Sequence, residues 1–233
     1  MVIAVSQAER VQLERMGVRP DRIRLLANPV DLEEHRQAPR RGAFRAAHGL
    51  SSDPVVLFLG KLTPRKRVDV LIRAFAEGVA PGARLVIAGN DMGSRRSLER
   101  LATDLGVSDR VMFTGLLRDA ARLGVLADAD VLVYPSEDEI FGLVPLEALL
   151  TSTPVVVADD SGCGELIDQV GGGLVTPVGN SDALAAAIRQ VLADPAQWRG
   201  RAAAAAVLVR QRYGGATVAA ELDGLYHDVL AAR

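Results

Sequence analysis

Two carboxylates flank a glycine-containing turn in the second half of the sequence. Glu139 precedes the turn at Phe141 and Gly142, and Glu147 follows in a segment that predicts a helix with Pro145 in its first turn. Unpaired N–H groups and a partial positive charge gather at a helix N-terminus, and glycine lets an anion approach the backbone closely. A phosphate at the turn with hydroxyl groups on either side would engage all of these groups, which is the chemistry of a nucleotide-sugar.

A structural explanation of the same residues stays open on spacing alone. Glu147, near the third position of its helix, could simply oppose the helix dipole. The acidic residues 137–139 could form an ordinary solvated loop. The elements around the turn and the neighbouring loops therefore have to decide between the two interpretations.

The composition is that of an ordinary soluble protein. The 233 residues are 49% apolar and 24% charged, with a net charge of −2, which fits one large domain or a domain and a half and does not indicate nucleic-acid binding. The single cysteine, Cys163, excludes an intrachain disulfide and fits a reducing compartment. No apolar run approaches the ~20 residues that span a bilayer, and residues 1–5 do not resemble a signal peptide. We expect a cytoplasmic protein without a metal site, since the three histidines are scattered.

Strands alternate with helices from residue 55 onward. Apolar runs typical of strands covered on both faces occur at residues 55–59, 84–88, 111–113, 131–134, 154–158 and 174–175. Helical segments follow these runs, and two or three helices finish the chain around residues 184–192, 198–209 and 218–230. This alternation predicts right-handed crossovers and a doubly wound parallel sheet, in which ligands bind beyond the carboxyl ends of the strands.

The first residues do not fit this alternation. Residues 2–5 predict a buried strand, Ser6 predicts the N-cap of a helix, and residues 22–26 predict a second strand. A buried strand needs neighbours, and nothing precedes this one to supply them. We therefore expect residues 1–34 to be the last strand and helix of an N-terminal domain that is otherwise absent, and residues 35–233 to be the ligand-binding domain.

The polar residues 33–53 separate these two parts and are rich in arginine. We expect them to form a linker and one helix around Phe44. Their arginines would either lie on a solvated helix face or make weak contact with an anionic membrane surface, which would place the protein at the inner face of the membrane.

A cationic loop follows the first strand of the predicted sheet. Gly60 permits a sharp exit from the strand, and four cations follow within seven residues, namely Lys61, Arg65, Lys66 and Arg67. Because the loop leaves the carboxyl end of a strand, we interpret it as a diphosphate site that uses charge-assisted hydrogen bonds. The alternative is an ordinary basic surface loop.

Three other patterns resemble known motifs and are not supported. Gly162 and Gly164 begin like a dinucleotide fingerprint, but Ile167 stands where the third glycine is needed. The cationic loop lacks the second glycine and the lysine–hydroxyl pair of a P-loop. Asp128 and Asp130 have the spacing of a metal motif, but they enter a strand at its amino end, so we interpret them as a helix-to-strand turn.

Four segments together resemble the C-terminal, donor-binding half of retaining glycosyltransferases of the GT-B fold, group 1 (family 4) type. They are residues 2–6 with Asn28 and Val30-Asp31, residues 60–62 with Arg65-Lys66, residues 136–147 with the Glu-x7-Glu spacing, and residues 162–165 before a Gly-Gly-Leu-Val strand. The resemblance covers nearly the whole chain and implies a Rossmann-like domain. It implies a nucleotide-diphosphate sugar as the donor, no metal or other cofactor, and a sugar, lipid or small molecule as the acceptor.

The resemblance also implies roles for the matched residues. Lys61 and Lys66 would hold the diphosphate, Glu147 would bind the ribose hydroxyls, and Glu139 would bind the donor sugar near its anomeric carbon. The sugar and phosphate would contact the backbone of Phe141, Gly142 and Leu143. The ribose would pack on Val144. The sequence departs from the family at five places: Pro29, Lys61, Arg67, Ser152 and Gly164. These departures put local loop shape in doubt, and Lys61 replaces a planar arginine fork by a point charge.

Two main functions are therefore expected from the sequence. The first is the donor-binding part of a glycosyltransferase, inactive without an N-terminal domain that was lost by truncation or is supplied by a partner chain. The alternative is a non-catalytic module that binds a nucleotide-sugar. A nicotinamide-dependent oxidoreductase is a third reading, which the missing glycine fingerprint disfavours.

Overall fold

The computed structural model describes residues 1–36, 41–50, 52–159 and 162–231, and these residues contain two separate parallel sheets. The larger sheet has the strand order β5-β4-β3-β6-β7-β8. In chain order its strands are β3 (Val55–Leu59), β4 (Arg84–Ala88), β5 (Val111–Gly115), β6 (Val131–Tyr134), β7 (Val155–Asp159) and β8 (Gly173–Pro177). The doubly wound parallel sheet predicted from the sequence is confirmed. The strand order reverses between β3 and β6, and ligands of such sheets bind beside this reversal.

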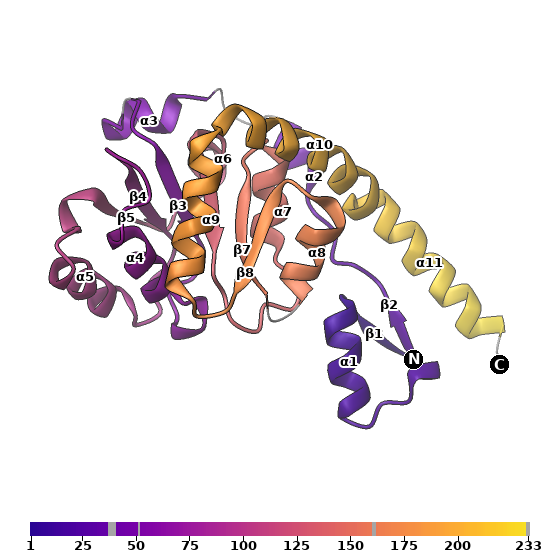
Figure 1. Ribbon diagram of the computed structural model, residues 1–233. Coiled ribbons are helices and arrows are strands. Elements are labelled where there is room, and N and C mark those ends of the chain that lie inside the picture. The colour runs from indigo at the N-terminus through magenta and orange to yellow at the C-terminus, as the bar shows by residue number, and fades with distance from the viewer. Residues whose placement is uncertain (37–40, 51, 160–161, 232–233) are drawn as a thin grey trace.

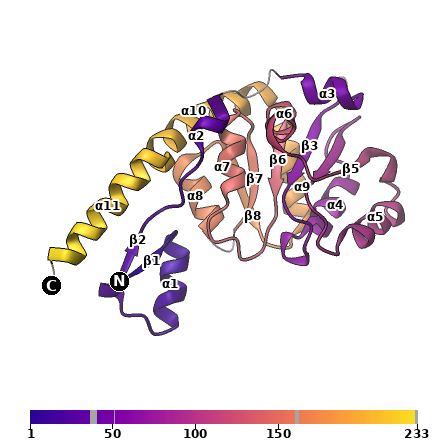
Figure 2. The same ribbon diagram turned by 180° about the vertical axis from the view of Figure 1, so that it is seen from behind.

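Helices cover both faces of the six-stranded sheet. One face carries α4 (Val68–Ala76), α5 (Arg95–Asp104) and α9 (Ser181–Ala193), which lie in front of the sheet in Figure 1. The other face carries α6 (Asp119–Asp128) and α7 (Leu143–Leu150), seen in Figure 2, with α10 (Pro195–Tyr213) packed against α7. All five residues of β3 are buried, which explains why this strand is a continuous apolar run.

The N-terminal segment forms the second, two-stranded sheet. β1 (Val2–Ala4) pairs in parallel with β2 (Ile23–Leu25), and α1 (Gln7–Arg15) connects them. In Figure 1 this segment lies to one side of the large sheet, below the last helix, α11 (Gly215–Ala231). Ser6 caps α1 as expected, because its hydroxyl accepts a hydrogen bond from the Glu9 N–H at 3.2 Å.

The sequence predicts a first strand of the buried type that lacks the neighbours needed to bury it, and in the structure this strand, β1, is largely exposed. The side chains of Val2 and Ile3 are 37% and 38% exposed, and only Ala4 of β1 is buried. The reason is that β1 pairs with β2 alone and no further layer among the described residues covers its outer face. An apolar sequence predicts a strand that can be buried, but it does not supply the surface that buries it.

The linker region differs from the single helix expected there. It contains two short helices, α2 (Leu32–Arg36) and α3 (Ala43–His48), with Phe44 buried on α3 as predicted. Arg45 donates to the Asp130 carboxylate at 2.6 Å, and Arg41 does so at 2.6 Å. These two arginines therefore attach α3 to the amino end of the sheet, and membrane contact by this region stays a prediction. Within the described residues, no helix is long and apolar enough to cross a membrane.

The two aspartates that resembled a metal motif lie at this amino end as interpreted. Asp130 accepts a hydrogen bond from the Val55 N–H at 2.8 Å, at the start of β3. Asp128 accepts hydrogen bonds from the N–H groups of Gly42 and Arg45. The Asp128 carboxylate thus satisfies backbone donors at the start of α3, and the Asp130 carboxylate satisfies a backbone donor of β3 and two arginines.

The helix that carries Glu147 differs from its expected position, whereas α8 (Gly162–Val170) follows β7 in the predicted alternation. α7 begins at Leu143, so that Glu147 is its fifth residue rather than near its third. The dipole explanation for Glu147 is weakened, because the effect of the dipole falls off beyond the first turn.

Candidate functional site

The loop after β3 and the turn after β6 meet at the carboxyl edge of the sheet. Lys66 Nζ donates to the Tyr134 hydroxyl at 2.5 Å and forms an ion pair with the Glu139 carboxylate. The Tyr134 hydroxyl in turn donates to Glu139 Oε2 at 3.3 Å. The side chains of Lys66 and Glu139 are only 11% and 18% exposed, so this cluster is largely shielded from water. Two residues that were predicted separately, 73 positions apart in the sequence, therefore form one charged cluster.

Tyr134 is a site residue that the sequence analysis assigned only to a strand. Burial and the neighbouring Glu139 carboxylate raise the pKa of its hydroxyl well above the ordinary value, so it keeps its proton and acts as a donor to Glu139. Its ring stacks on Phe58 with 6.1 Å between ring centroids, which fixes the hydroxyl at the end of β6. The sequence could have indicated Tyr134 as a site residue, because it is the last residue of β6 and so lies at the carboxyl edge of the sheet.

The cationic loop and the acidic loop are also joined through their backbones. The Glu137 N–H donates to the Arg65 carbonyl at 2.9 Å, and the Arg65 guanidinium donates to the Asp138 carbonyl at 2.8 Å. Lys61, by contrast, is exposed and makes no side-chain hydrogen bond or ion pair with any residue that the structure describes. Lys61 and Lys66 are the only lysines in the sequence, so both lysine amines lie in this one loop.

The turn before α7 is held in place by the start of α8. Gly142 has φ +82°, and a Cβ at this position would lie 2.5 Å from Cys163 Sγ. The Cys163 N–H donates to the Glu139 carbonyl at 3.0 Å. A Cβ on Gly162 would lie 1.7 Å from the Ile140 carbonyl oxygen. Both glycines are therefore required by close approach, and together they fix the backbone that carries Glu139.

The residues around the turn differ in what they can offer a ligand. The Phe141 side chain is buried and meets Tyr213 edge to face, with ring centroids 5.8 Å apart, so only its backbone is available. Leu143 is exposed, and Val144 is partly buried at the start of α7. The N–H groups of the first turn of α7 are oriented as an anion site requires.

Glu147 lies apart from this cluster, on the face of the sheet that α6 and α7 cover. Its carboxylate pairs with Arg122 of α6, whose other nitrogen pairs with Glu34 of α2 at 2.6 Å. Burial raises the pKa of Glu147, and the Arg122 guanidinium opposes this shift. Arg122 was not predicted from the sequence, although it is the only cation within α6.

A doubly wound parallel sheet with a cationic loop, a glycine turn and the Lys66–Glu139 ion pair at its carboxyl edge is the arrangement expected for the C-terminal domain of a GT-B glycosyltransferase. The chain belongs to the family of glycosyl transferases group 1, which residues 41–206 match. This membership confirms the resemblance stated from the sequence and decides against the oxidoreductase reading.

Relatives and solved structures agree with this family. The chain is 37% identical over 206 residues to the D-inositol 3-phosphate glycosyltransferase of Saccharomonospora viridis, covering 83% of this chain and 48% of the relative. It is 30% identical over 234 residues to the alpha-D-kanosaminyltransferase of Streptomyces kanamyceticus, covering 98% of this chain and 60% of the relative. The chain therefore spans about half the length of these curated relatives.

The fold is similar to that of Anabaena HepE in its complex with UDP, with a TM-score of 0.89 and 27% identity over 98% of this chain and 64% of that one. It is also similar to sucrose-phosphate synthase of Thermosynechococcus elongatus, with a TM-score of 0.87 and 30% identity over 100% of this chain and 59% of that one.

Proposed function

We propose that the chain is the donor-binding part of a retaining glycosyltransferase, which transfers a sugar from a nucleoside diphosphate sugar to an acceptor. The observation that carries the proposal is the Lys66–Glu139–Tyr134 cluster beside the turn at Gly142. Its place at the carboxyl edge, where the strand order reverses, is where a doubly wound sheet binds nucleotides. Support comes from HepE, a similar fold that was solved with UDP and with UDP-glucose.

The two lysines and the turn are assigned to the diphosphate. When the bond between the anomeric carbon and the phosphate oxygen breaks, negative charge develops on the leaving phosphate. Lys66, Lys61 and the N–H groups at the start of α7 would stabilise that charge. Lys66 would exchange part of its contact with Glu139 for the phosphate. Glu139 would then accept hydrogen bonds from hydroxyls of the donor sugar, close to the anomeric carbon.

Glu147 is assigned to the ribose, and Val144 to packing against it. An ionised carboxylate can accept hydrogen bonds from two neighbouring hydroxyls. Arg122 lies beside Glu147 and favours this ionised form. Ribose recognition in this assignment therefore depends on a residue of α6 as well as on α7.

Replacing Arg122 with glutamine should make the binding of UDP dependent on pH. Without the guanidinium, burial acts with less opposition and the pKa of Glu147 rises further. A protonated Glu147 accepts hydroxyl hydrogen bonds poorly, so affinity should fall about tenfold as the pH is lowered from about 8 to 6. The native chain should change much less. Calorimetry across this pH range measures the effect.

The control for this experiment is Glu147→Gln, which cannot ionise. Its affinity for UDP should be low at every pH. An Arg122→Gln variant that follows the native chain throughout the range would contradict the role assigned to Arg122.

Donor binding should not require a divalent cation. The charges that face the diphosphate in this proposal are the amines of Lys61 and Lys66, and amines can neutralise phosphate without a metal. The affinity for UDP should therefore stay the same when Mg²⁺ or Mn²⁺ is added and when a chelator is present. A strong loss of affinity on adding the chelator would count against the assignment.

Transfer is proposed to need an N-terminal domain in addition to the residues of this chain. The chain spans about half of its curated relatives, and Val2, Ile3 and Leu25 expose apolar side chains on the small sheet. An acceptor has to be held against the anomeric carbon, and positioning of this kind supplies much of the rate of a transfer. The acceptor, whether a sugar, a lipid or a small alcohol, would be held between this chain and that domain.

The experiment that tests the function measures binding and transfer separately. The purified chain is titrated with UDP, GDP, ADP and their glucose conjugates, and then assayed for transfer to a panel of sugar, lipid and alcohol acceptors. We expect nucleotide-sugar binding without transfer, and transfer once a matching N-terminal domain is added. Binding that never leads to transfer would favour the non-catalytic module, and turnover by the chain alone would contradict the need for the domain.

A further inference from the structure

A cavity of about 550 Å³ opens on the α4 and α5 side of the carboxyl edge. It lies between the residues that follow Leu62, the start of α5 and the two acidic residues before Glu139. We call it the α4–α5 pocket, and its lining is Thr63, Pro64, Arg65, Arg67, Val68, Asp69, Ser94, Ser97, Leu98, Glu137 and Asp138. None of the residues assigned to the donor lines it.

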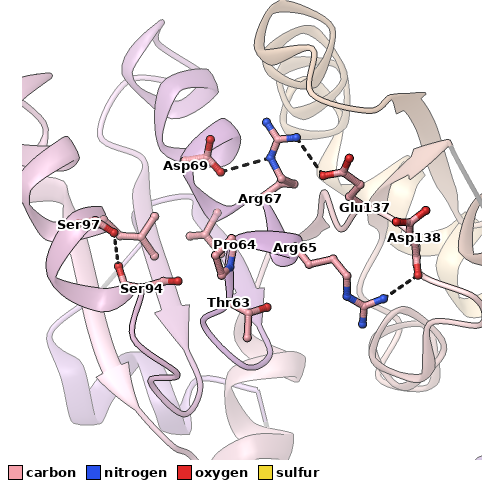
Figure 3. Close-up of a pocket in the computed structure, with 11 residues that line it drawn as sticks. Thr63, Pro64, Arg65, Arg67, Asp69, Ser94, Ser97, Glu137 and Asp138 are labelled. Carbon is pink, nitrogen blue, oxygen red and sulfur yellow. Dashed lines mark hydrogen bonds and ion pairs between the residues drawn. The ribbon is translucent and has the colours of Figure 1, made fainter.

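Both arginines of the α4–α5 pocket already bind acceptors within its lining. Arg67 lies between Asp69, at 3.5 Å, and Glu137, at 3.2 Å (Figure 3). Arg65 donates to the Asp138 carbonyl at 2.8 Å. The lining thus holds three carboxylates against two guanidiniums and has no excess of positive charge. Such a pocket does not favour a phosphate or another anion.

Hydroxyls and apolar atoms complete the lining. Thr63, Ser94 and Ser97 contribute side-chain hydroxyls, and Ser97 donates its own to the Ser94 carbonyl at 2.7 Å. Three further residues add apolar surface, namely Pro64, Val68 and Leu98. The lining therefore combines donors and acceptors with apolar surface, and the volume falls within the range of about 300–1,000 Å³ that is usual for small-molecule sites.

A sugar ring has the complementary chemistry. Each ring hydroxyl can donate and accept, so carboxylates, guanidiniums and hydroxyls can all pair with it. The C–H groups of the ring can cover apolar side chains. The ring carries no charge, so it does not require the excess of cations that the pocket lacks.

We propose that the α4–α5 pocket binds a sugar ring during the reaction. The inference rests on the proposed function, and it follows from the position of the pocket next to the reacting centre. Glu137 and Asp138 directly precede Glu139, and Arg65 and Arg67 flank Lys66. The helix that carries Glu147, α7, lies with α6 on the opposite face of the sheet (Figure 2). This geometry favours a saccharide acceptor as the molecule that supplies the sugar ring. The alternative is the sugar of the donor itself.

The test uses Ser97→Trp, which fills the pocket from an exposed helix position, with Ser108→Trp as a matched control at an exposed serine outside it. Saturation-transfer NMR measures binding of methyl glycosides and disaccharides to the full chain, and calorimetry measures UDP and UDP-glucose. We expect Ser97→Trp to weaken saccharide binding at least about tenfold, while Ser108→Trp stays within about twofold of the native chain. Thermal melting confirms that both variants are folded.

The outcomes distinguish an acceptor sugar from the donor sugar in the pocket. They also distinguish failure of this inference from failure of the proposed function. A loss confined to free saccharides assigns the pocket to the acceptor. A loss of UDP-glucose affinity without a loss of UDP affinity assigns it to the donor sugar. If no saccharide of the panel binds, or if Ser97→Trp instead abolishes the binding of inorganic phosphate, the inference is overturned. Nucleotide-sugar binding that persists in that case leaves the proposed function standing.

Discussion

Replacing Gly162 with alanine is expected to lower the melting temperature by roughly 6–12 °C and to abolish nucleotide-sugar binding. The new Cβ would lie 1.7 Å from the Ile140 carbonyl oxygen and 2.5 Å from the Ser6 hydroxyl oxygen. The carbonyl cannot rotate away as a side chain could, because it belongs to the turn between Glu139 and Gly142. Overpacking of this kind costs about 3 kcal/mol, and each kcal/mol is worth about 2–4 °C in a chain of this size.

Matched controls are available in the long C-terminal helices. A Cβ added to Gly200 in α10 or to Gly224 in α11 would meet no neighbouring group within 4 Å, so alanine fits at both positions. Alanine at either position should stabilise the chain by about 0.5–1 kcal/mol, because glycine is unfavourable inside a helix. Calorimetric melting and UDP titration measure all three variants. A Gly162→Ala protein that melts with the native chain would show that the turn moves freely against α8.

Replacing Lys66 with alanine is expected to weaken the binding of UDP by about tenfold to a hundredfold. A hydrogen bond to a charged group is worth about 1.5–3 kcal/mol, which corresponds to this range of affinity. Binding of uridine, which has no phosphate, should hardly change. The structure adds a reason for a large effect, because Lys66 also holds Glu139 and Tyr134 in one cluster.

The variant Tyr134→Phe distinguishes the contribution of the Lys66 charge to UDP binding from the contribution of its exact position. This variant keeps the ammonium group but removes the hydroxyl that holds it, so UDP affinity should fall by less than in Lys66→Ala. Titration of UDP and uridine with each variant by calorimetry provides the comparison. Equal losses for the two ligands in Lys66→Ala would contradict the assignment of this residue to the diphosphate.

The sheet could be predicted because its strands are short apolar runs separated by helical segments. Residues 55–59 and 84–88 have the same bounds in the structure as in the prediction. The position of Lys66 and Glu139 at the same edge of the sheet could be predicted as well, since each follows a strand that ends there. Their direct pairing could not be predicted, because it depends on the conformations of two loops and not on either sequence segment alone.

Arg122 and the α4–α5 pocket were missed for a related reason. The role proposed for Arg122 depends on its contact with Glu147, and this contact exists only because α6 and α7 pack side by side. The pocket combines loop residues such as Arg67 with the start of α5 at Ser97, and neither segment suggests a binding site by itself. The exposure of Val2 and Ile3, in contrast, agrees with the expectation that their strand lacks neighbours to bury it.

The confinement of both lysines to the loop after β3 makes this protein a natural target for amine labelling. All other basic side chains except histidine are arginines, which amine-reactive reagents leave unmodified. Lys61 is exposed and should react quickly, whereas the Lys66 amine is held between a carboxylate and a phenol. The labelling ratio of the two lysines, read by peptide mass, would therefore report occupancy of the proposed donor site without any introduced probe.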